Sequence, residues 1–170
     1  MVITLRVITA DNFYACASLT LGDGEERFVA PNVWGIAESQ FFPWLIARAI
    51  YNDDTPVGFV LYGYKDGPDA DPIVGQTWHI TRFMIDASQR GKGFGRAGMR
   101  AVIEAIGTAP DPHNCPVITL SYRPGNIIAA RLYASLGFET VGVGSREQTI
   151  MRRSLRERGG PASSCIVPQG

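Results

Sequence analysis

The residues with the clearest potential for chemistry form a glycine-rich segment, residues 90–96 with the sequence RGKGFGR. Glycines at alternate positions let a backbone turn tightly and approach a ligand with no side chain in the way. The segment follows a predicted strand and opens a predicted helix, whose first N–H groups lack partners within the helix and carry partial positive charge. Together with the charges of Arg90, Lys92 and Arg96, this pattern predicts a binding site for a pyrophosphate group.

Other phosphate-binding loops fit the glycine segment less well. A dinucleotide-binding loop would need glycine where Arg96 stands, and a Walker loop would need a Gly-Lys-Ser/Thr sequence that is absent. A nucleotide-binding domain therefore fits the sequence least well. A plain turn between a strand and a helix would also explain the glycines, if they are taken alone.

A second informative segment, residues 126–139, predicts a helix with defined ends. Asn126 can cap the helix, which runs to about Leu136, and Gly137 can close it in the left-handed conformation. The helix carries Tyr133, which taken alone is interpreted as a half-buried packing residue.

The elements that must position these segments follow from hydrophobic periodicity. Alternating patterns predict strands over residues 2–9, 44–51, 57–64, 77–85, 117–122, 139–143 and 148–155. Helical patterns predict a helix from Asp11 to about Leu19, one over 31–39, one from Gly91 to about Ile106 that Gly107 stops, and the helix after Asn126. Strands that precede, interleave with and follow helices indicate one mixed α/β (α+β) domain over residues 1–155. Residues 156–170 lack periodicity and are interpreted as a C-terminal tail.

Composition excludes several classes of function. The chain has 170 residues, of which 45% are hydrophobic and 19% charged, and its 16 basic and 16 acidic side chains balance. Such a balance gives no electrostatic basis for binding nucleic acid. No stretch approaches the ~20 apolar residues of a membrane span, and residues 1–9 lack the features of a signal peptide. We therefore expect a cytoplasmic protein with no nucleic-acid or membrane partner.

The cysteines show no pattern of disulfides or metal ligands. Cys16, Cys115 and Cys165 have no paired spacing, and His113 near Cys115 lacks a second ligand pair. Neither a disulfide framework nor a zinc site is expected.

The two segments together resemble a known superfamily. Arg90-x-x-Gly93-x-Gly95 resembles the acetyl-CoA pyrophosphate motif of the GNAT N-acetyltransferases, and residues 126–139 resemble the second signature of that superfamily. The motifs occur in the matching order with a predicted strand between them, and the resemblance runs from about Leu5 to Leu155. It implies the GNAT acyl-CoA N-acyltransferase fold, with a mixed sheet of about seven strands flanked by helices on both faces. It also implies acetyl-CoA as co-substrate and no metal.

The resemblance assigns roles to individual residues. It implies that the pantetheine arm lies in a gap between two splayed strands, that an N–H near Met84 faces the thioester oxygen, and that Tyr133 is the general acid. The residues expected to bind acetyl-CoA are Phe83, Met84, Ile85, Gln89, Arg90, Gly91, Lys92, Gly93, Phe94, Gly95, Arg96, Asn126 and Tyr133.

The general base is left open by the sequence. Some relatives carry an acidic residue where this chain has Thr81, which cannot act as a base. His79 lies two residues earlier, on the same face of a regular strand, and its ordinary pKa suits proton transfer. Glu26 could accept the proton through water or bind an acceptor ammonium, and a water chain to the solvent is the remaining alternative.

The acceptor amine is suggested by a narrower likeness. Residues 26–32, 57–59 and 78–86 are similar to segments of bacterial spermine/spermidine (diamine) acetyltransferases, which implies a small polyamine or diamine. A polycation would favour carboxylates along its path, for which Glu25, Glu26 and Glu38 are candidates. The alternatives are another amine (a protein N-terminus, an antibiotic or an amino acid) and a non-catalytic acyl-CoA-binding module. Because relatives are often dimers, the resemblance also suggests a homodimer.

Overall fold

A seven-stranded mixed sheet forms the centre of the computed structural model, which describes residues 2–65, 75–109 and 117–155. The strand order is β1-β2-β3-β4-β5-β7-β6. The strands are β1 (Ile3–Val7), β2 (Leu45–Asn52), β3 (Thr55–Lys65), β4 (Thr77–Ile85), β5 (Val117–Tyr122), β6 (Glu139–Val143) and β7 (Thr149–Ser154). Only the β4–β5 pair is parallel. The expected α/β fold with seven strands is confirmed.

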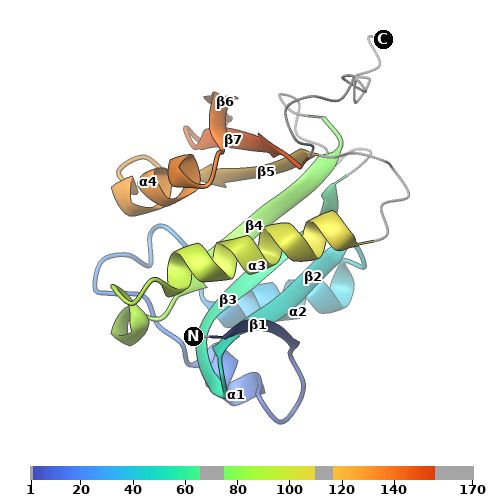
Figure 1. Cartoon of the computed structure of the whole chain (residues 1–170), viewed down its shortest axis with the longest axis vertical. Helices are drawn as coiled ribbons and strands as arrows, with labels where there is room; N and C mark the ends of the chain where they lie inside the picture. Colours follow the sequence, from blue (N-terminus) through green and yellow to red (C-terminus); the bar gives the residue numbers. More distant parts are fainter. Residues whose placement is uncertain (1, 66–74, 110–116, 156–170) are drawn as a thin grey trace.

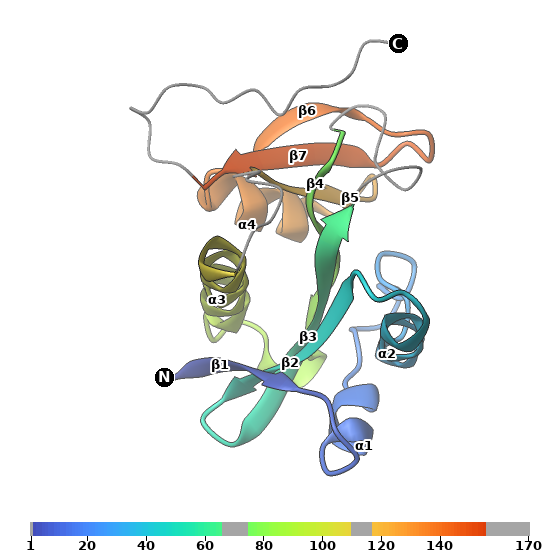
Figure 2. The ribbon, with the colours of Figure 1, turned by 90° about the vertical axis from the view of Figure 1, so that its right-hand side faces the viewer.

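Helices cover both faces of this sheet (Figures 1 and 2). α1 (Phe13–Ala17) and α2 (Asn32–Phe41) lie on one face, and α3 (Phe94–Thr108) lies on the other. α4 (Ile127–Ser135) stands beside β5 and β7. No helix of the described residues is long and apolar enough to cross a bilayer.

The core has one part on each side of the sheet, as the alternation of side chains along β3 requires. Val60 points into the cluster that α3 covers with Met99 and Val102. Phe59 and Leu61 point into the opposite cluster, beneath α1 and α2. Because both faces are covered, β3 is buried over most of its length, and it gives the neighbouring β4 a rigid support.

Two helix boundaries differ from the sequence-based predictions. α1 has only five residues and begins after Asn12 rather than Asp11, and the Asn12 side chain accepts a hydrogen bond from the Thr9 N–H. α3 begins at Phe94, and Gly93 occupies the N-cap position. The helix continues through Gly107 to Thr108, so the expected stop at Gly107 is wrong. A glycine weakens a helix interior without ending it.

The feature that positions the site is the separation of β4 from β5. These parallel strands pair only from Trp78 to Ile80 on β4 and from Ile118 to Leu120 on β5. Beyond these pairs the strands diverge toward α4 and the beginning of α3 (Figure 1). The last four residues of β4, from Arg82 to Ile85, keep their partners on β3 but have none on β5. A gap with an unpaired strand edge therefore opens in the middle of the sheet, as the resemblance implied.

A β-bulge lies where this gap begins. Ile80 pairs with Tyr62 and Arg82 pairs with Leu61, so Thr81 is an extra residue on β4. Bulges bend a strand and change the direction of its side chains. The period-two relation that was expected to put His79 and Thr81 on one face therefore does not hold across this point.

Candidate active site

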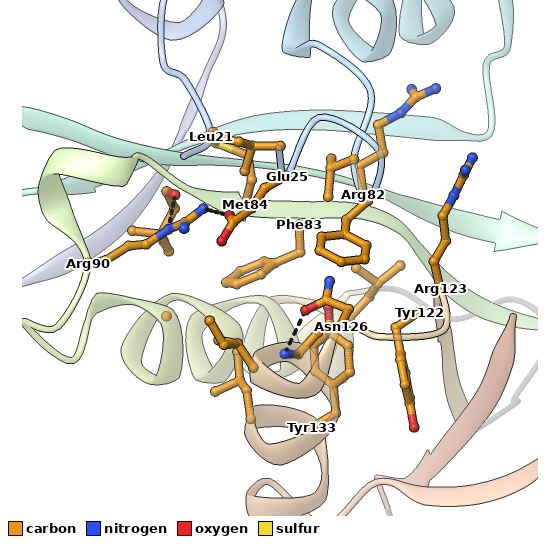
Figure 3. Close-up of a pocket in the computed structure, with 18 of the residues that line it drawn as sticks. Leu21, Glu25, Arg82, Phe83, Met84, Arg90, Tyr122, Arg123, Asn126 and Tyr133 are labelled. Carbon is orange, nitrogen blue, oxygen red and sulfur yellow. Dashed lines mark hydrogen bonds and ion pairs between the residues drawn. The ribbon is translucent and has the colours of Figure 1, made fainter. Parts of the chain in front are cut away.

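A cavity of about 740 Å³ occupies the gap between β4 and β5. Its floor is the unpaired half of β4, and its walls come from the N-terminal loop near Glu25, the glycine segment, the start of α4 and the β6–β7 turn (Figure 3). Of the thirteen residues expected to bind acetyl-CoA, eleven line this cavity: Phe83, Met84, Ile85, Gln89, Arg90, Gly91, Gly93, Phe94, Gly95, Asn126 and Tyr133. The other two, Lys92 and Arg96, lie outside the lining.

The glycine segment forms a tight, exposed turn into α3. Gly91 and Gly93 have φ values of 74° and 82°, a left-handed conformation that glycine adopts without strain. Gly93 caps α3 with no side-chain hydrogen bond, so the N–H groups of the first helical turn have no side-chain partner at that cap. The turn therefore presents free backbone donors at one end of the cavity, where an anion can bind.

Two of the three charged side chains of this segment, Arg90 and Lys92, are already engaged. Arg90 Nη2 lies 2.5 Å from Glu25 Oε2, and Arg90 Nε donates to the Ile85 carbonyl at 3.4 Å. Lys92 Nζ donates to the Ser88 carbonyl and to Gln89 Oε1, which tie the lysine to the turn before it. Arg90 is therefore the cation of the segment that reaches into the cavity.

Helix α4 brings Asn126 and Tyr133 to the cavity. Asn126 Oδ1 accepts a hydrogen bond from the Ala129 N–H at 3.1 Å, and Gly137 has a φ of 82°, so both predicted helix ends are confirmed. Tyr133 lies about two turns further along α4, beneath Asn126 in Figure 3. Its ring lies 6.3 Å from that of Tyr122 and 6.1 Å from that of Phe138.

The environment of Tyr133 keeps its hydroxyl protonated. The side chain is only 7% exposed, and burial raises its pKa to about 12. A phenol in the neutral form can donate a proton to a stronger base that develops beside it. No hydrogen bond of this hydroxyl is found among the described residues, so the donor is available to a ligand in the cavity.

The two residues expected to act as a base lie outside the cavity lining. His79 Nδ1 lies 2.9 Å from Thr119 Oγ1, and burial, with the charge of Lys65, lowers the pKa of His79 to about 3. Glu26 is exposed. Its neighbour Glu25 lines the cavity instead, in the ion pair with Arg90. The geometry therefore does not bring His79 or Glu26 together with Tyr133.

Several cavity residues escaped the sequence reasoning: Arg82, Tyr122, Arg123, Arg146 and Gln148. Tyr122 is the last residue of β5 and Arg123 follows it, and β5 was expected only as a strand between the motifs. Arg146 and Gln148 come from the β6–β7 turn, which has no motif. Only the fold brings these segments to the same cavity.

Arg82 is fixed by α2. Its guanidinium makes a bidentate ion pair with Glu38, at 2.5 and 2.9 Å, which lowers the pKa of the Glu38 carboxyl. Gly35, one turn earlier on α2, permits this approach. A Cβ at Gly35 would stand 2.9 Å from the Phe59 ring and 3.1 Å from Arg82 Nη1.

No group of three or more His, Cys, Asp or Glu side chains in the described parts of the chain could hold a metal ion. Cys16 is buried and unpaired. His113, Cys115 and the tail at 156–170 lie outside the described residues.

The geometry fits a coenzyme A thioester. Free N–H groups and Arg90 suit the diphosphate at one end of the cavity, and the unpaired edge of β4 suits the amide groups of a pantetheine arm. An elongated ligand that is anionic at one end and carries amides along its length matches this layout. Fold and cavity together define a CoA-dependent acyltransferase.

Comparison with known proteins agrees with this class. The model of the acetyltransferase (GNAT) family matches residues 12–138. The spermine/spermidine N(1)-acetyltransferase of Bacillus subtilis is 28% identical over 84% of this chain and 91% of its own. An aminoglycoside N(6')-acetyltransferase type 1 from Klebsiella pneumoniae is 32% identical over 72% of this chain and 58% of its own.

Among solved structures, the aminoglycoside acetyltransferase AAC(6')-Ib in complex with coenzyme A has a TM-score of 0.68 at 21% identity, covering 90% of this chain and 95% of its own. The ribosomal-protein-S18-alanine N-acetyltransferase of Escherichia coli has a TM-score of 0.63 at 18% identity, covering 95% and 99%. The chain therefore belongs to the GNAT acetyltransferase family. It is an N-acetyltransferase whose co-substrate is acetyl-CoA.

Proposed function

We propose that this chain transfers the acetyl group of acetyl-CoA directly to a small primary amine, with Tyr133 as the general acid. The observation that carries the proposal is the position of Tyr133, buried in the wall of the gap where the edge of β4 is unpaired. A thioester held along that edge would lie beside the one phenol of the described lining that burial keeps strongly protonated.

The transfer balances without a metal or redox partner. The amine nitrogen attacks the thioester carbonyl carbon, a C–N bond forms, and the C–S bond breaks with its electron pair on sulfur. Tyr133 gives its hydroxyl proton to that sulfur, and the proton that the new amide nitrogen loses returns to the phenolate through water. A main-chain N–H near Met84 stabilises the negative charge that develops on the carbonyl oxygen, a role typically worth about 3 kcal/mol.

Water acts as the base that deprotonates the acceptor ammonium. An acceptor ammonium must lose one proton before attack, and the only carboxylate of the described cavity lining, Glu25, is paired with Arg90. His79 makes its hydrogen bond to Thr119, and its lowered pKa makes it a weak base. A chain of water molecules to the solvent is the alternative that this geometry favours.

A small polyamine or diamine is the acceptor that the sequence relatives support. The Bacillus subtilis relative is named as a spermine/spermidine acetyltransferase, and it matches most of this chain. A second acceptor class is favoured by the charges of the cavity itself. The cytoplasmic location and the homodimer expected from the sequence remain predictions.

The acid role is tested by Tyr133→Phe, which removes the hydroxyl and keeps the ring. We expect kcat to fall by about 10²–10³, within the usual range for a general acid, while the Kd for acetyl-CoA stays within about twofold. Tyr122→Phe is the matched control, because its ring lies next to that of Tyr133. Unchanged turnover in Tyr133→Phe, or a larger loss in Tyr122→Phe, would remove Tyr133 from the acid role.

A further inference from the structure

The described lining of the cavity carries an excess of positive charge. It contains the arginines Arg82, Arg90, Arg123 and Arg146, and Glu25 is its only carboxylate. A site for a polycation would show the opposite balance, because like charges disfavour binding. The sign of the charge therefore bears on which amines can bind.

Two of the four arginines are neutralised by carboxylates. Arg90 pairs with Glu25, and Arg82 pairs with Glu38 on α2. The first pair lies at the glycine segment and the second lies against α2. Each pair contributes little net charge to the cavity.

The other two, Arg123 and Arg146, have no ion-pair partner among the described residues and are exposed to the cavity. Figure 3 shows Arg123 on the side of the pocket away from Arg90. The phosphates of coenzyme A belong at the glycine segment, so they do not account for a cation at this position.

The two free arginines also come from turns at the same end of the β5–β7 pair. Pairing of β5 with β7 ends at Tyr122 and Thr149, so Arg123 leaves β5 at the end where the turn with Arg146 enters β7. The turn that carries Arg146 is held in place, since Gln148 Oε1 accepts from the Arg146 N–H at 3.0 Å and the Gln148 carbonyl accepts from the Gly144 N–H at 2.9 Å. Glu147, the acidic residue of this turn, is exposed and outside the lining.

From this arrangement we infer that the acceptor is a small amine that also carries a carboxylate, which Arg123 and Arg146 bind. Guanidinium groups match carboxylates in charge and in hydrogen-bond geometry. The inference rests on the proposed function, because it names the acceptor class of the same site. It also gives the arginines an effect on the amine itself: nearby positive charge favours the neutral form that attacks the thioester.

The experiment compares amines that differ only by a carboxylate, namely lysine with cadaverine and ornithine with putrescine. Steady-state kcat/KM is measured on the full-length chain at saturating acetyl-CoA. We expect the amino acid of each pair to be favoured by about tenfold, the size expected for one charged hydrogen-bonded contact. An acidic dipeptide with a free N-terminus, measured in parallel, distinguishes a peptide source of the carboxylate from a free amino acid.

Substitutions then test the two arginines. Arg123→Gln and Arg146→Gln should each reduce the preference for the amino acid by about fivefold, through the KM for the amine and not through the KM for acetyl-CoA. Arg123→Lys should retain part of the preference. Arg100→Gln, an exposed arginine of α3 outside the cavity lining, is the matched control and should retain all of it.

The outcomes separate this inference from the proposed function. If cadaverine and putrescine are acetylated as well as or better than the amino acids, or if both glutamine variants keep the wild-type preference, the inference is wrong while the proposed function stands. If no amine is acetylated although acetyl-CoA binds, the proposed function fails, and this inference fails with it.

Discussion

Glu25 and Arg90 form an ion pair with 2.5 Å between Oε2 and Nη2, at the end of the cavity where the glycine segment turns into α3. Glu25 belongs to the N-terminal loop and Arg90 to the segment after β4, so the ion pair links these two segments. Both side chains remain about one-third exposed, which limits the strength of the pair. The carboxylate therefore stands where a diphosphate would require positive charge.

The first prediction concerns this carboxylate. In Glu25→Gln, Arg90 no longer pairs with a negative side chain and a phosphate no longer meets like charge, so acetyl-CoA should bind about three- to tenfold more tightly. Isothermal titration calorimetry at low ionic strength measures the change, which should shrink as salt is added. Glu26→Gln is the control, because Glu26 is exposed and outside the lining. Weaker binding by Glu25→Gln would mean that Glu25 instead orients Arg90 for the ligand.

The second prediction concerns Gly93, which we expect to be required for acetyl-CoA binding. Gly93→Val places a branched side chain in the expected phosphate position, and it also strains a left-handed residue by about 1–2 kcal/mol. Gly137→Val separates the two effects, because Gly137 has the same φ of 82° at the end of α4. Both variants should lose stability in urea unfolding, but only Gly93→Val should lose binding. Tight binding of acetyl-CoA by Gly93→Val would contradict the predicted phosphate site at the glycine segment.

The third prediction follows from the unexpected length of α3. Gly107 lies within the last turn of the helix, and a Cβ there would meet only Leu155 Cδ2, at an ordinary 3.9 Å. Gly107→Ala should therefore raise the free energy of unfolding by about 0.5–1 kcal/mol. Denaturant unfolding of the two proteins checks this. A loss of stability would indicate that α3 ends before residue 107, as the sequence alone predicted.

The fourth prediction concerns His79 and pH. Its pKa in the folded state, about 3, is below the ordinary value of 6.5, so between these values the unfolded chain binds the extra proton. Stability should therefore be fully present above about pH 6.5 and fall as the pH is lowered toward 3, by up to about 1.4 kcal/mol per pH unit from this group.

His79→Gln isolates that contribution. It keeps a hydrogen-bonding group near Thr119 but cannot take up the proton, so its stability should fall less steeply between pH 6.5 and 4. Urea unfolding across this range gives the two slopes. Equal slopes would show that His79 is not protonated on unfolding there. Loss of acetyl transfer at neutral pH in a folded His79→Gln protein would restore His79 as a candidate base.

Local signals were sufficient to predict the strands, the turn of the glycine segment and α4. Alternating apolar residues identified the seven strands, and Asn126 and Gly137 marked the ends of α4 by their own backbone preferences. In each case the information lies within a few neighbouring residues. The family resemblance then supplied the gap between β4 and β5, which no local pattern indicates.

The remaining features depend on contacts between distant segments. The bulge at Thr81 arises from the pairing of β4 with β3. Because the sequence did not indicate this bulge, His79 was expected on the same face of the strand as Thr81. Glu25 and Glu26 are indistinguishable in an irregular loop, so only the fold shows which one reaches Arg90. Arg123 and Arg146 come from separate turns, and the register of β5 against β7 brings these turns to the same end of the strand pair.

The short contact between β4 and β5 has an energetic consequence for ligand binding. Among the described residues, strand pairing joins β1–β4 to β5, β6 and β7 through only three residue pairs, and backbone groups further along β4 meet no described strand on that side. A ligand with amide groups can form hydrogen bonds with the unpaired edge of β4, as an added strand would. Ligand binding should therefore stabilise the two halves of the sheet against separation. Slower amide hydrogen exchange in both β4 and β5 would show this stabilisation.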